Sequence, residues 1–152
     1  MKKIEIYLDT SIIGGLFDNE FKQQTESLIE KIKNEKITGV ISEITIRELE
    51  NAPENVRKSF ESYKNKLLVI QITDEIEQLA EEYIKEKGIT EKFYEDALHI
   101  ASATVLQVDV LVSWNFKHIV NFNRILKFNA VNLKNGYHTL QIYSPLEVIN
   151  EE

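Results

Sequence analysis

The chain has 152 residues, of which 43% are hydrophobic and 28% are charged, and it contains no cysteine. A chain of this length can bury a core, so we expect one domain over residues 1–150. The lack of cysteine excludes disulfides and thiolate metal sites. No run of about 18 apolar residues occurs, which argues against a signal peptide or a membrane span. We therefore expect a cytoplasmic protein that does not bind a membrane.

The formal net charge is −7, but the acidic residues are unevenly distributed. The segment from Val110 to Leu146 contains no Asp or Glu. It carries the basic residues Lys117, His118, Arg124, Lys127, Lys134 and His138. The chain is thus an acidic body with a locally basic C-terminal third, and such a basic segment can bind phosphates even when the net charge is negative.

Five short strands are expected in chain order, with helices between them. The strands are predicted over residues 4–8, 37–41, 67–72, 109–112 and 139–144. The helices are predicted over residues 25–36, 43–50, 55–66, 74–87 and 95–105, with a last one from residue 145. The Gly14–Gly15 pair is expected to break any helix after the first strand, and the basic segment carries no predicted helix. This alternation predicts a three-layer α/β/α fold with a five-stranded parallel sheet.

Capping residues mark several helix ends in the sequence. Ser42 and Thr73 have the hydroxyl side chains that N-caps use, and acidic residues follow both. The run 144–147 places a Ser at the N-cap, Pro at N1 and Glu at N3 of the last helix. Gly88 is expected as the C′ residue that ends the helix beginning at Asp74.

Three acidic residues stand at positions where a site can form. Asp9 follows the first strand, and ligands bind at the carboxyl ends of strands in open α/β sheets. Glu48 lies one helical turn after Ile44, beside the buried stripe of its helix, although a lone Glu of this kind can also be an ordinary surface residue. Asp96 lies in the first turn of a buried helix, where it either joins the site or only completes the helix end. If the three converge, their repulsion favours a hard cation such as Mg²⁺ or Mn²⁺.

Two further polar residues near these acids are open to more than one interpretation. His99 is either a hydrogen-bonded core histidine or a residue near the site. Asn115 lies at the carboxyl end of the fourth strand, as Asp9 does for the first. Asp109 begins that fourth strand instead, so we predict a structural role for it. No glycine-rich phosphate loop occurs, which argues against a nucleotide cofactor.

These motifs together resemble the PIN-domain family, and in particular the VapC-type toxins of bacterial toxin–antitoxin pairs. The resemblance covers essentially the whole chain and rests on residues 7–11, 41–49, 96–103 and 109–115. It implies a five-stranded parallel sheet and a Mg²⁺- or Mn²⁺-dependent endoribonuclease that hydrolyses RNA phosphodiester bonds. It also implies a homodimer and, for a toxin, a cognate antitoxin partner that holds it inactive.

The resemblance assigns roles to individual residues by position. Asp9, Glu48 and Asp96 match the three acids that hold the metal. Asn115 stands where the family often supplies a fourth acid, so it brings an amide oxygen without charge and leaves open whether one metal or two bind. Thr10, Ser11 and Ser113 match family hydroxyls near the acids. Beside the resemblance, the basic segment itself offers Trp114, Lys117 and His118 as further residues that can contact the RNA. Among the aromatic residues of the basic segment, we expect most to pack in the core and Trp114 to face the RNA.

Two other functions remain compatible with the sequence. Asn115 favours a PIN-like module that binds RNA without cleaving it. A phosphotransfer hydrolase or a receiver domain would also begin with an Asp after a strand. The hydrolase usually has a second Asp two residues later, where this chain has Ser11. The receiver domain usually has a paired acid and a late lysine, which we do not find convincingly.

Overall fold

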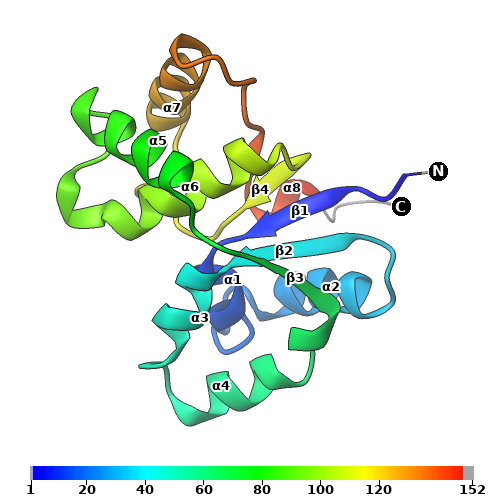
Figure 1. Cartoon of the computed structure of the whole chain (residues 1–152). Coiled ribbons are helices and arrows are strands. Elements are labelled where there is room, and N and C mark those ends of the chain that lie inside the picture. The colour runs from blue at the N-terminus through cyan, green and yellow to red at the C-terminus, as the bar shows by residue number, and fades with distance from the viewer. Residues whose placement is uncertain (1, 149–152) are drawn as a thin grey trace.

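A computed structural model describes residues 2–148 and contains a five-stranded parallel sheet in the order β3-β2-β1-β4-β5 (Figure 1). The strands are β1 Glu5–Leu8, β2 Thr38–Ser42, β3 Leu67–Ile70, β4 Val110–Val112 and β5 Ile142–Tyr143. The helices are α1 Thr10–Gly15, α2 Lys22–Lys33, α3 Glu43–Leu49, α4 Glu54–Glu61, α5 Asp74–Lys85, α6 Tyr94–Leu106, α7 Phe122–Lys134 and α8 Pro145–Val148, with short 3-10 turns at Lys64–Lys66 and Glu91–Phe93. The predicted fold class is confirmed, whereas residues 1, 149 and 150 of the predicted domain lie outside the described part of the chain.

Strand periodicity divides the core into two layers. Tyr7 pairs in register with Val40 on one side and Leu111 on the other, and all three side chains are buried on the same face of the sheet. The next residues along, including Leu8 and Val112, are buried on the opposite face. Both faces are therefore apolar, as expected for a parallel sheet that is covered by helices on both sides.

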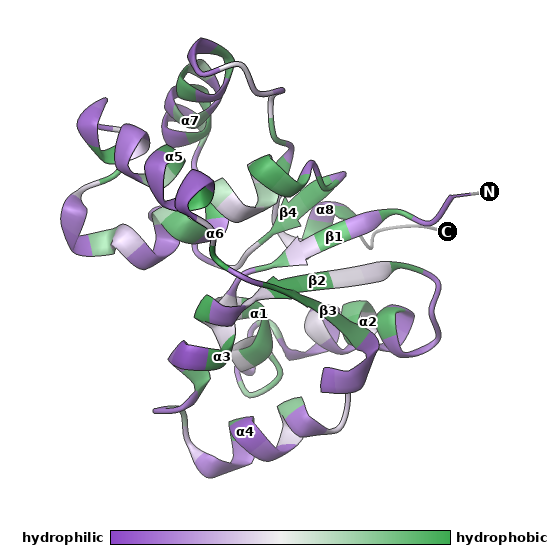
Figure 2. Ribbon diagram, in the orientation of Figure 1, coloured by the Kyte–Doolittle hydropathy of each residue, from purple (hydrophilic) through white to green (hydrophobic). Residues whose placement is uncertain are grey.

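Helices cover both faces of this sheet. The core on one face is built with α5, α6 and α7, and the core on the other with α1, α2 and α4 (Figure 1). Their hydrophobic residues lie largely toward the sheet and their hydrophilic residues toward the outside (Figure 2). Residues 97–104 of α6 are all buried, which confirms the prediction of a helix that is buried all round. The described residues include no helix long and apolar enough to cross a membrane.

The predicted N-caps at Ser42, Thr73 and Ser144 are confirmed. The Ser42 hydroxyl accepts a hydrogen bond from the backbone N–H of Ile44, and Thr73 does the same for Ile76. In α8, the Glu147 carboxylate accepts from the backbone N–H of the N-cap serine, as a capping box requires. These side chains begin α3 and α5 directly after β2 and β3, which places both helix starts at the same edge of the sheet.

The prediction for the Gly14–Gly15 pair is wrong, because α1 runs from Thr10 through Gly15. A Cβ atom built on Gly15 would lie 2.6 Å from the Thr25 hydroxyl and 2.8 Å from Trp114 Nε1. Gly15 therefore allows close approach between α1 and these two side chains, and it is the last residue of that helix. Gly14 has no such neighbours.

The C-terminus of α5 also differs from the prediction. The C′ residue in the left-handed region is Lys87, at φ 65°, and not Gly88. The Gly88 N–H donates to the Tyr83 carbonyl and the Lys87 N–H to the Ile84 carbonyl, which is the Schellman pattern. A Cβ on Gly88 would lie 3.3 Å from the Phe128 ring, so the glycine is explained by its packing against α7.

The largest omission of the sequence-based prediction is α7, a helix of 13 residues in the middle of the basic segment. Asn121 caps this helix by accepting a hydrogen bond from the Arg124 backbone N–H. Elsewhere the boundaries shift: the fifth strand shortens to β5, and the predicted helix over 55–66 divides into α4 and a 3-10 turn. β5 pairs only with the three-residue β4, which explains its short length.

Candidate active site

Asp9 lies at the carboxyl end of β1 and is held by two serine hydroxyls. Leu8 pairs in register with Val112, so the residue after β1 lies beside the residue after β4. The Ser11 hydroxyl donates to Asp9 Oδ1 at 2.6 Å, and the Ser113 hydroxyl donates to Oδ2 at 2.9 Å. Asp9 is only 3% exposed, so both carboxylate oxygens are fixed in a buried position.

Glu48 reaches the same edge of the sheet from α3. Its Oε1 atom accepts a short hydrogen bond from the Thr10 hydroxyl. His99 Nε2 lies 2.9 Å from the same oxygen, and because a carboxylate only accepts, the ring N–H donates to it. The side chain is half-buried, so the alternative of an ordinary surface glutamate is wrong.

Asp96 and Asn115 form the third part of the site. Asp96 lies in the first turn of α6, and the Asn115 side-chain N–H donates to its Oδ2 at 3.3 Å. The Asn115 Oδ1 atom accepts from the backbone N–H of His118 at 3.0 Å. Both ends of the Asn115 amide are therefore engaged, so this residue holds Asp96 and the turn after β4 in place.

His99 is both a core residue and a neighbour of the site, so the two alternatives left by the sequence are both partly right. It is 1% exposed, and its Nδ1 atom lies 2.7 Å from the Tyr7 hydroxyl. The Tyr7 hydroxyl in turn donates to Ser42. The sequence-based prediction missed Tyr7 and Ser42 as residues behind the site. A tyrosine in an otherwise aliphatic buried strand is the signal that pointed to such a partner.

The electrostatics of the three acids differ from one another. Burial raises the pKa of Asp9, although its hydroxyl partners and His99 act in the opposite direction. Burial, and then the negative charge of Asp9, raise the pKa of Asp96 to about 6. Burial also acts to raise the pKa of Glu48, but the His99 and Thr10 hydrogen bonds and the His99 charge outweigh it and lower the pKa. The site thus concentrates negative charge, and the charged forms of Asp9 and Asp96 are disfavoured relative to their neutral forms.

The donor chemistry of the site fits a hard divalent cation, because the three acids offer only carboxylate oxygens. As the side chains stand, residues 2–148 contain no group of three or more His, Asp or Glu residues that could hold a metal ion. Glu48 directs one oxygen to Thr10 and His99, which is one reason why a closed ligand set is not preformed. The assignment of Asp9, Glu48 and Asp96 as ligands stays a prediction.

Trp114 does not face the substrate side, so that prediction is wrong. The residue is 6% exposed, and its ring stacks on Phe21 with the ring centroids 4.0 Å apart. Its indole N–H donates to the Thr25 hydroxyl at 2.9 Å. Trp114 instead anchors α2 against the end of β4, where its backbone N–H donates to Ser11.

His118 is buried as well, in contrast to the prediction that it contacts phosphate. Its ring packs against Phe93 with the centroids 3.8 Å apart, and its Nδ1 atom has no hydrogen-bond partner. Lys117 and Phe116, by contrast, are exposed on the turn that follows Asn115. Of the residues predicted to contact substrate, Lys117 is therefore the one whose charged side chain lies open to solvent next to the site.

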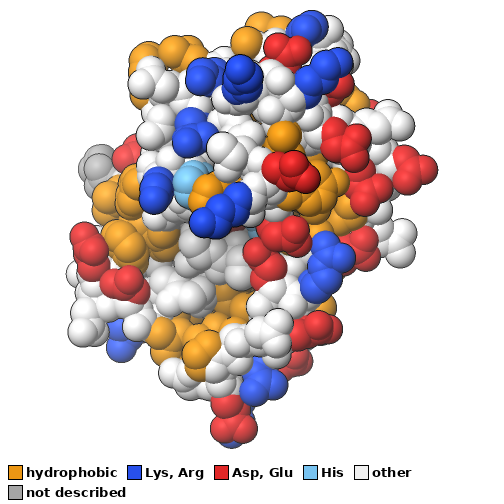
Figure 3. Space-filling model, turned by 90° about the vertical axis from the view of Figure 1, so that its left-hand side faces the viewer, with side chains coloured by type: hydrophobic (Ala, Val, Ile, Leu, Met, Phe, Trp, Pro, Cys, Tyr) orange, Lys and Arg blue, Asp and Glu red, His pale blue; other side chains and the backbone are white. Residues whose placement is uncertain are grey.

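The charged side chains are unevenly placed on the face of the molecule onto which the sheet's carboxyl ends open (Figure 3). Lys and Arg side chains gather on its upper part, where α7 lies in Figure 1, and acidic side chains lie mostly on its right and lower parts. Two of the basic residues already have partners: Arg124 donates to the Gly88 carbonyl and Lys134 pairs with Glu86 at 2.9 Å.

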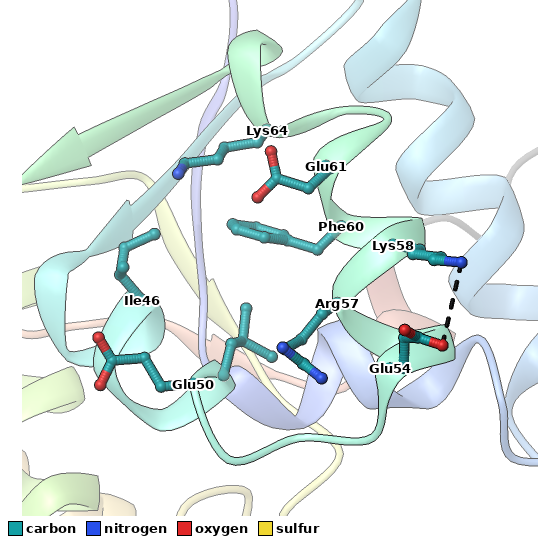
Figure 4. Close-up of a pocket in the computed structure, with 9 residues that line it drawn as sticks. Ile46, Glu50, Glu54, Arg57, Lys58, Phe60, Glu61 and Lys64 are labelled. Carbon is teal, nitrogen blue, oxygen red and sulfur yellow. Dashed lines mark ion pairs between the residues drawn. The ribbon is translucent and has the colours of Figure 1, made fainter.

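A separate pocket of about 390 Å³ lies between α3 and α4 (Figure 4). Ile46, Leu49 and Phe60 give it an apolar lining, with charged side chains at its rim. Glu48 is two residues beyond Ile46 and so projects from the opposite face of α3. This pocket is therefore not part of the acidic site.

Comparisons with known proteins agree with this geometry. The PIN domain family model matches residues 6–117, which include all three acids and Asn115. The structure of VapBC2 from Rickettsia felis bound to a promoter DNA fragment is similar, with a TM-score of 0.62 and 19% identity over 93% of this chain and 98% of that one. The structure of VapBC-1 from Haemophilus influenzae has a TM-score of 0.60 and 23% identity over the same shares.

A third structure is that of VapC20 from Mycobacterium tuberculosis, described as a toxin that cleaves the sarcin-ricin loop. It has a TM-score of 0.55 and 13% identity over 74% of this chain and 92% of that one. At these identities the likeness shows the fold, and no curated protein matches the chain. The family model matches well over half of the sequence, and on that basis the chain belongs to the PIN domain family.

Proposed function

We propose that the chain is a Mg²⁺- or Mn²⁺-dependent endoribonuclease that hydrolyses RNA phosphodiester bonds and serves as the toxin of a type II toxin–antitoxin pair. The observation that carries this proposal is the set of three carboxylates, Asp9, Glu48 and Asp96, that come from three elements and interact electrostatically at one edge of the sheet. Their hydrogen bonds come from serine and threonine hydroxyls, the Asn115 amide and the His99 ring. The negative charge of the site is therefore available to a cation.

In this proposal, Asp9, Glu48 and Asp96 would hold the metal, and a bound divalent cation would supply activation of water and stabilisation of negative charge at the scissile phosphate. The remaining residues keep the acids in position. Ser11 and Ser113 each donate a hydrogen bond to one oxygen of Asp9. Thr10 and His99 both donate to Oε1 of Glu48, so Oε2 makes no hydrogen bond with either of them. Asn115 takes one oxygen of Asp96. The catalytic role that we propose for Asn115 is therefore to orient Asp96, since its own oxygen is engaged by the His118 backbone.

The substrate and partner assignments follow from the same site and the family. We propose that RNA approaches from the side of the turn after β4, where Lys117 is exposed and can contact a phosphate. Several of the similar structures are described as toxin–antitoxin complexes, which supports a cognate antitoxin as a protein partner. The resemblance also favours a homodimer.

The test is cleavage of a labelled single-stranded RNA by purified protein with Mg²⁺, with Mn²⁺ and with EDTA. We expect cleavage only with metal, and Asp9→Asn should lower it by more than the roughly 10–100-fold that is typical of losing an outer partner of a ligand. Asp109→Asn is the matched control. Asp109 accepts a hydrogen bond from the Glu5 backbone at the opposite end of the strands, as its predicted structural role requires. Full activity of Asp9→Asn, or cleavage in EDTA, would refute the proposal.

A second candidate function is an RNA-binding module that does not cleave. Asn115 favours it, because an amide replaces a possible fourth charge beside Asp96. This candidate predicts RNA retention in EDTA and no cleavage under either cation. Asn115→Asp separates the two candidates, since added charge at this position should raise cleavage only in a protein that already binds metal for catalysis.

A further inference from the structure

Three basic residues from three separate segments lie around one pair of packed rings beside the candidate active site. The His118 ring packs against Phe93 with the ring centroids 3.8 Å apart. The Lys92 ammonium group lies over the Phe93 ring, 5.7 Å from its centroid. Burial, and then the charges of Arg124 and Lys117, lower the pKa of His118, so both of these cations lie close to that ring. The name basic cluster is used below for Lys92, Lys117 and Arg124.

The positive charges of the basic cluster are not neutralised by ion pairs. Lys92 and Lys117 are exposed, and neither belongs to an ion pair within residues 2–148. Arg124 donates to the Gly88 carbonyl at 2.8 Å, which orients the guanidinium group but leaves its charge in place. The lowered pKa keeps the His118 ring uncharged at neutral pH. The cluster therefore presents three positive charges around a neutral ring.

The basic cluster is built on the same two chain segments as part of the carboxylate site. Phe93 comes three residues before Asp96, which corresponds to about 5 Å along a helix. His118 comes three residues after Asn115. The Asn115 amide joins the two segments, because its N–H donates to Asp96 and its oxygen accepts from the His118 backbone. The cluster therefore lies about one helical turn from Asp96, on the face whose upper part is basic in Figure 3.

A phosphate backbone fits this arrangement of charges. The protein has a net charge of −7 and gathers three carboxylates at the site, so it repels an RNA strand overall. Local cations must therefore supply the attraction that brings a phosphate beside those acids. Lysine acts on phosphate as a point charge, and arginine offers planar N–H donors to its oxygens. The basic cluster combines both kinds of group close to the carboxylates.

We propose that the basic cluster is a second phosphate-binding site, which holds the RNA backbone at a phosphate neighbouring the scissile one. This inference rests on the proposed RNA substrate and adds a requirement to it: the strand must continue past the scissile bond on the side of the cluster. The cluster contributes to substrate binding and not to the chemical step, because its residues do not touch the carboxylates through any hydrogen bond or ion pair of the described chain. Arg124 lies beyond residues 6–117, so the family model does not include this part of the site.

Fluorescence anisotropy of a labelled uridine 15-mer, titrated with Asp9→Asn protein in EDTA, tests this inference without cleavage. Lys92→Ala combined with Lys117→Ala should raise Kd at least about tenfold and reduce the slope of log Kd on log salt by about 1.4. The matched control is Lys33→Ala combined with Lys36→Ala, which removes the same charge from exposed positions before β2, at the opposite edge of the sheet. The control should change Kd by less than about twofold. No loss of affinity in the first double variant, or an equal loss in the control, would overturn the inference.

Two further binding measurements identify phosphate as the group that is recognised. Lys92→Arg combined with Lys117→Arg keeps both charges and should retain RNA affinity within about threefold. A thymidine 15-mer of DNA should lose affinity for the alanine double variant by the same factor as RNA, since both strands carry the same phosphates. A loss confined to RNA would indicate contacts with 2′-hydroxyl groups and would overturn the phosphate assignment. If the alanine double variant binds RNA normally but no longer binds a glutamate 15-mer, the cluster is a surface for an acidic peptide and the inference fails.

Cleavage kinetics with Mg²⁺ separate this inference from the proposed nuclease. In a chain that keeps Asp9, the alanine double variant should raise KM at least about fivefold and leave kcat within about twofold, as expected for lost substrate binding. A fall in kcat at unchanged KM would place these lysines at the reacting phosphate and overturn the inference. RNA binding through the cluster without cleavage under either cation would refute the nuclease and leave this site standing. Cleavage and RNA binding that are both unaffected by the double variant would do the reverse.

Discussion

Replacing Asp96 by Asn should make the metal-free protein more stable at neutral pH. Asp96 lies half-buried at the start of α6, and its pKa is raised from the ordinary value of 3.8 to about 6, first by burial and then by the charge of Asp9. At pH 7 and above Asp96 is therefore charged in both states, and its ionisation costs more free energy in the folded protein than in the unfolded chain. An asparagine at this position keeps the size of the side chain and can still accept a hydrogen bond from Asn115, but it carries no charge.

The sign follows from proton linkage. A carboxyl whose pKa is higher in the folded state stabilises the fold below its unfolded pKa, and that stabilisation is lost as the pH rises through the folded value. A rise from 3.8 to about 6 corresponds to about 3 kcal/mol in full. Because Asp96 keeps part of its surface in solvent, we reduce the expected gain of Asp96→Asn to about 1–2 kcal/mol above pH 6.5. The difference should vanish near pH 4.

Urea unfolding in EDTA between pH 4 and pH 8 measures this difference. The matched control is Glu95→Gln, one residue earlier in the same helix turn, where the acid is exposed and pairs with Arg47. The control should show no comparable pH-dependent gain. Mg²⁺ should narrow the gap between wild type and Asp96→Asn, because a cation that binds only the folded wild type stabilises it. If Asp96→Asn is less stable than wild type at pH 7.5, or its effect does not change with pH, the electrostatic description of the site is wrong.

Three further predictions concern single side chains. Trp114→Ala should lower the free energy of unfolding by about 3–5 kcal/mol in urea, because the ring is buried on Phe21, and a loss of RNA affinity at full stability would contradict this. Thr73→Ala should cost about 1 kcal/mol by the same measurement, since the N-terminus of α5 loses its cap, and an unchanged midpoint would contradict the capping role. Lys117→Ala, measured by RNA binding of Asp9→Asn protein against salt, should reduce the slope of log Kd on log salt by about 0.7, whereas an identical slope would exclude a phosphate contact.

The parts of the fold that could be predicted from sequence are those specified by neighbouring residues. Ser42 and Thr73 cap helices because a hydroxyl at the N-cap needs only the N–H groups two or three residues ahead. The strands were recognisable because both faces of the sheet are covered, which makes each strand a short apolar run.

The parts that failed depend on contacts between distant residues. Helix α7 has apolar residues on two sides, one toward the core and one toward solvent, so its sequence shows no single stripe. Gly88 looked like a helix terminator, but its role is to admit the Phe128 ring from a segment 40 residues later in the sequence. Trp114 looked like a stacking platform because nothing in its neighbourhood reveals that Phe21 and Thr25 cover it.

The candidate site could be predicted from the sequence only in part. Position along the chain was enough to select Asp9, because a carboxylate after the first strand must lie at the sheet edge. It was not enough to decide the role of His99, since its closest partners, Tyr7 and Glu48, are 92 and 51 residues away. The predicted contact of His118 with phosphate failed for the same reason, because Phe93 approaches it from the turn before α6.

The two aspartates of the site differ from the other perturbed acids of the protein in the sign of their pKa shifts, because the pKa values of Asp9 and Asp96 are raised whereas that of Glu48 is lowered. Glu35 and Glu86 lie on the surface beside Lys66 and Lys134, and those partners lower their pKa values. Asp9 and Asp96 are held by hydroxyl and amide groups that orient a carboxylate without cancelling its charge. Burial raises the pKa of both, and the charge of Asp9 adds to the rise for Asp96, although the His99 charge acts in the opposite direction on each. Such an arrangement weakens the metal-free fold and strengthens the attraction for a cation by the same interactions. Asp96→Asn, which should stabilise the metal-free protein, is therefore also expected to abolish RNA cleavage.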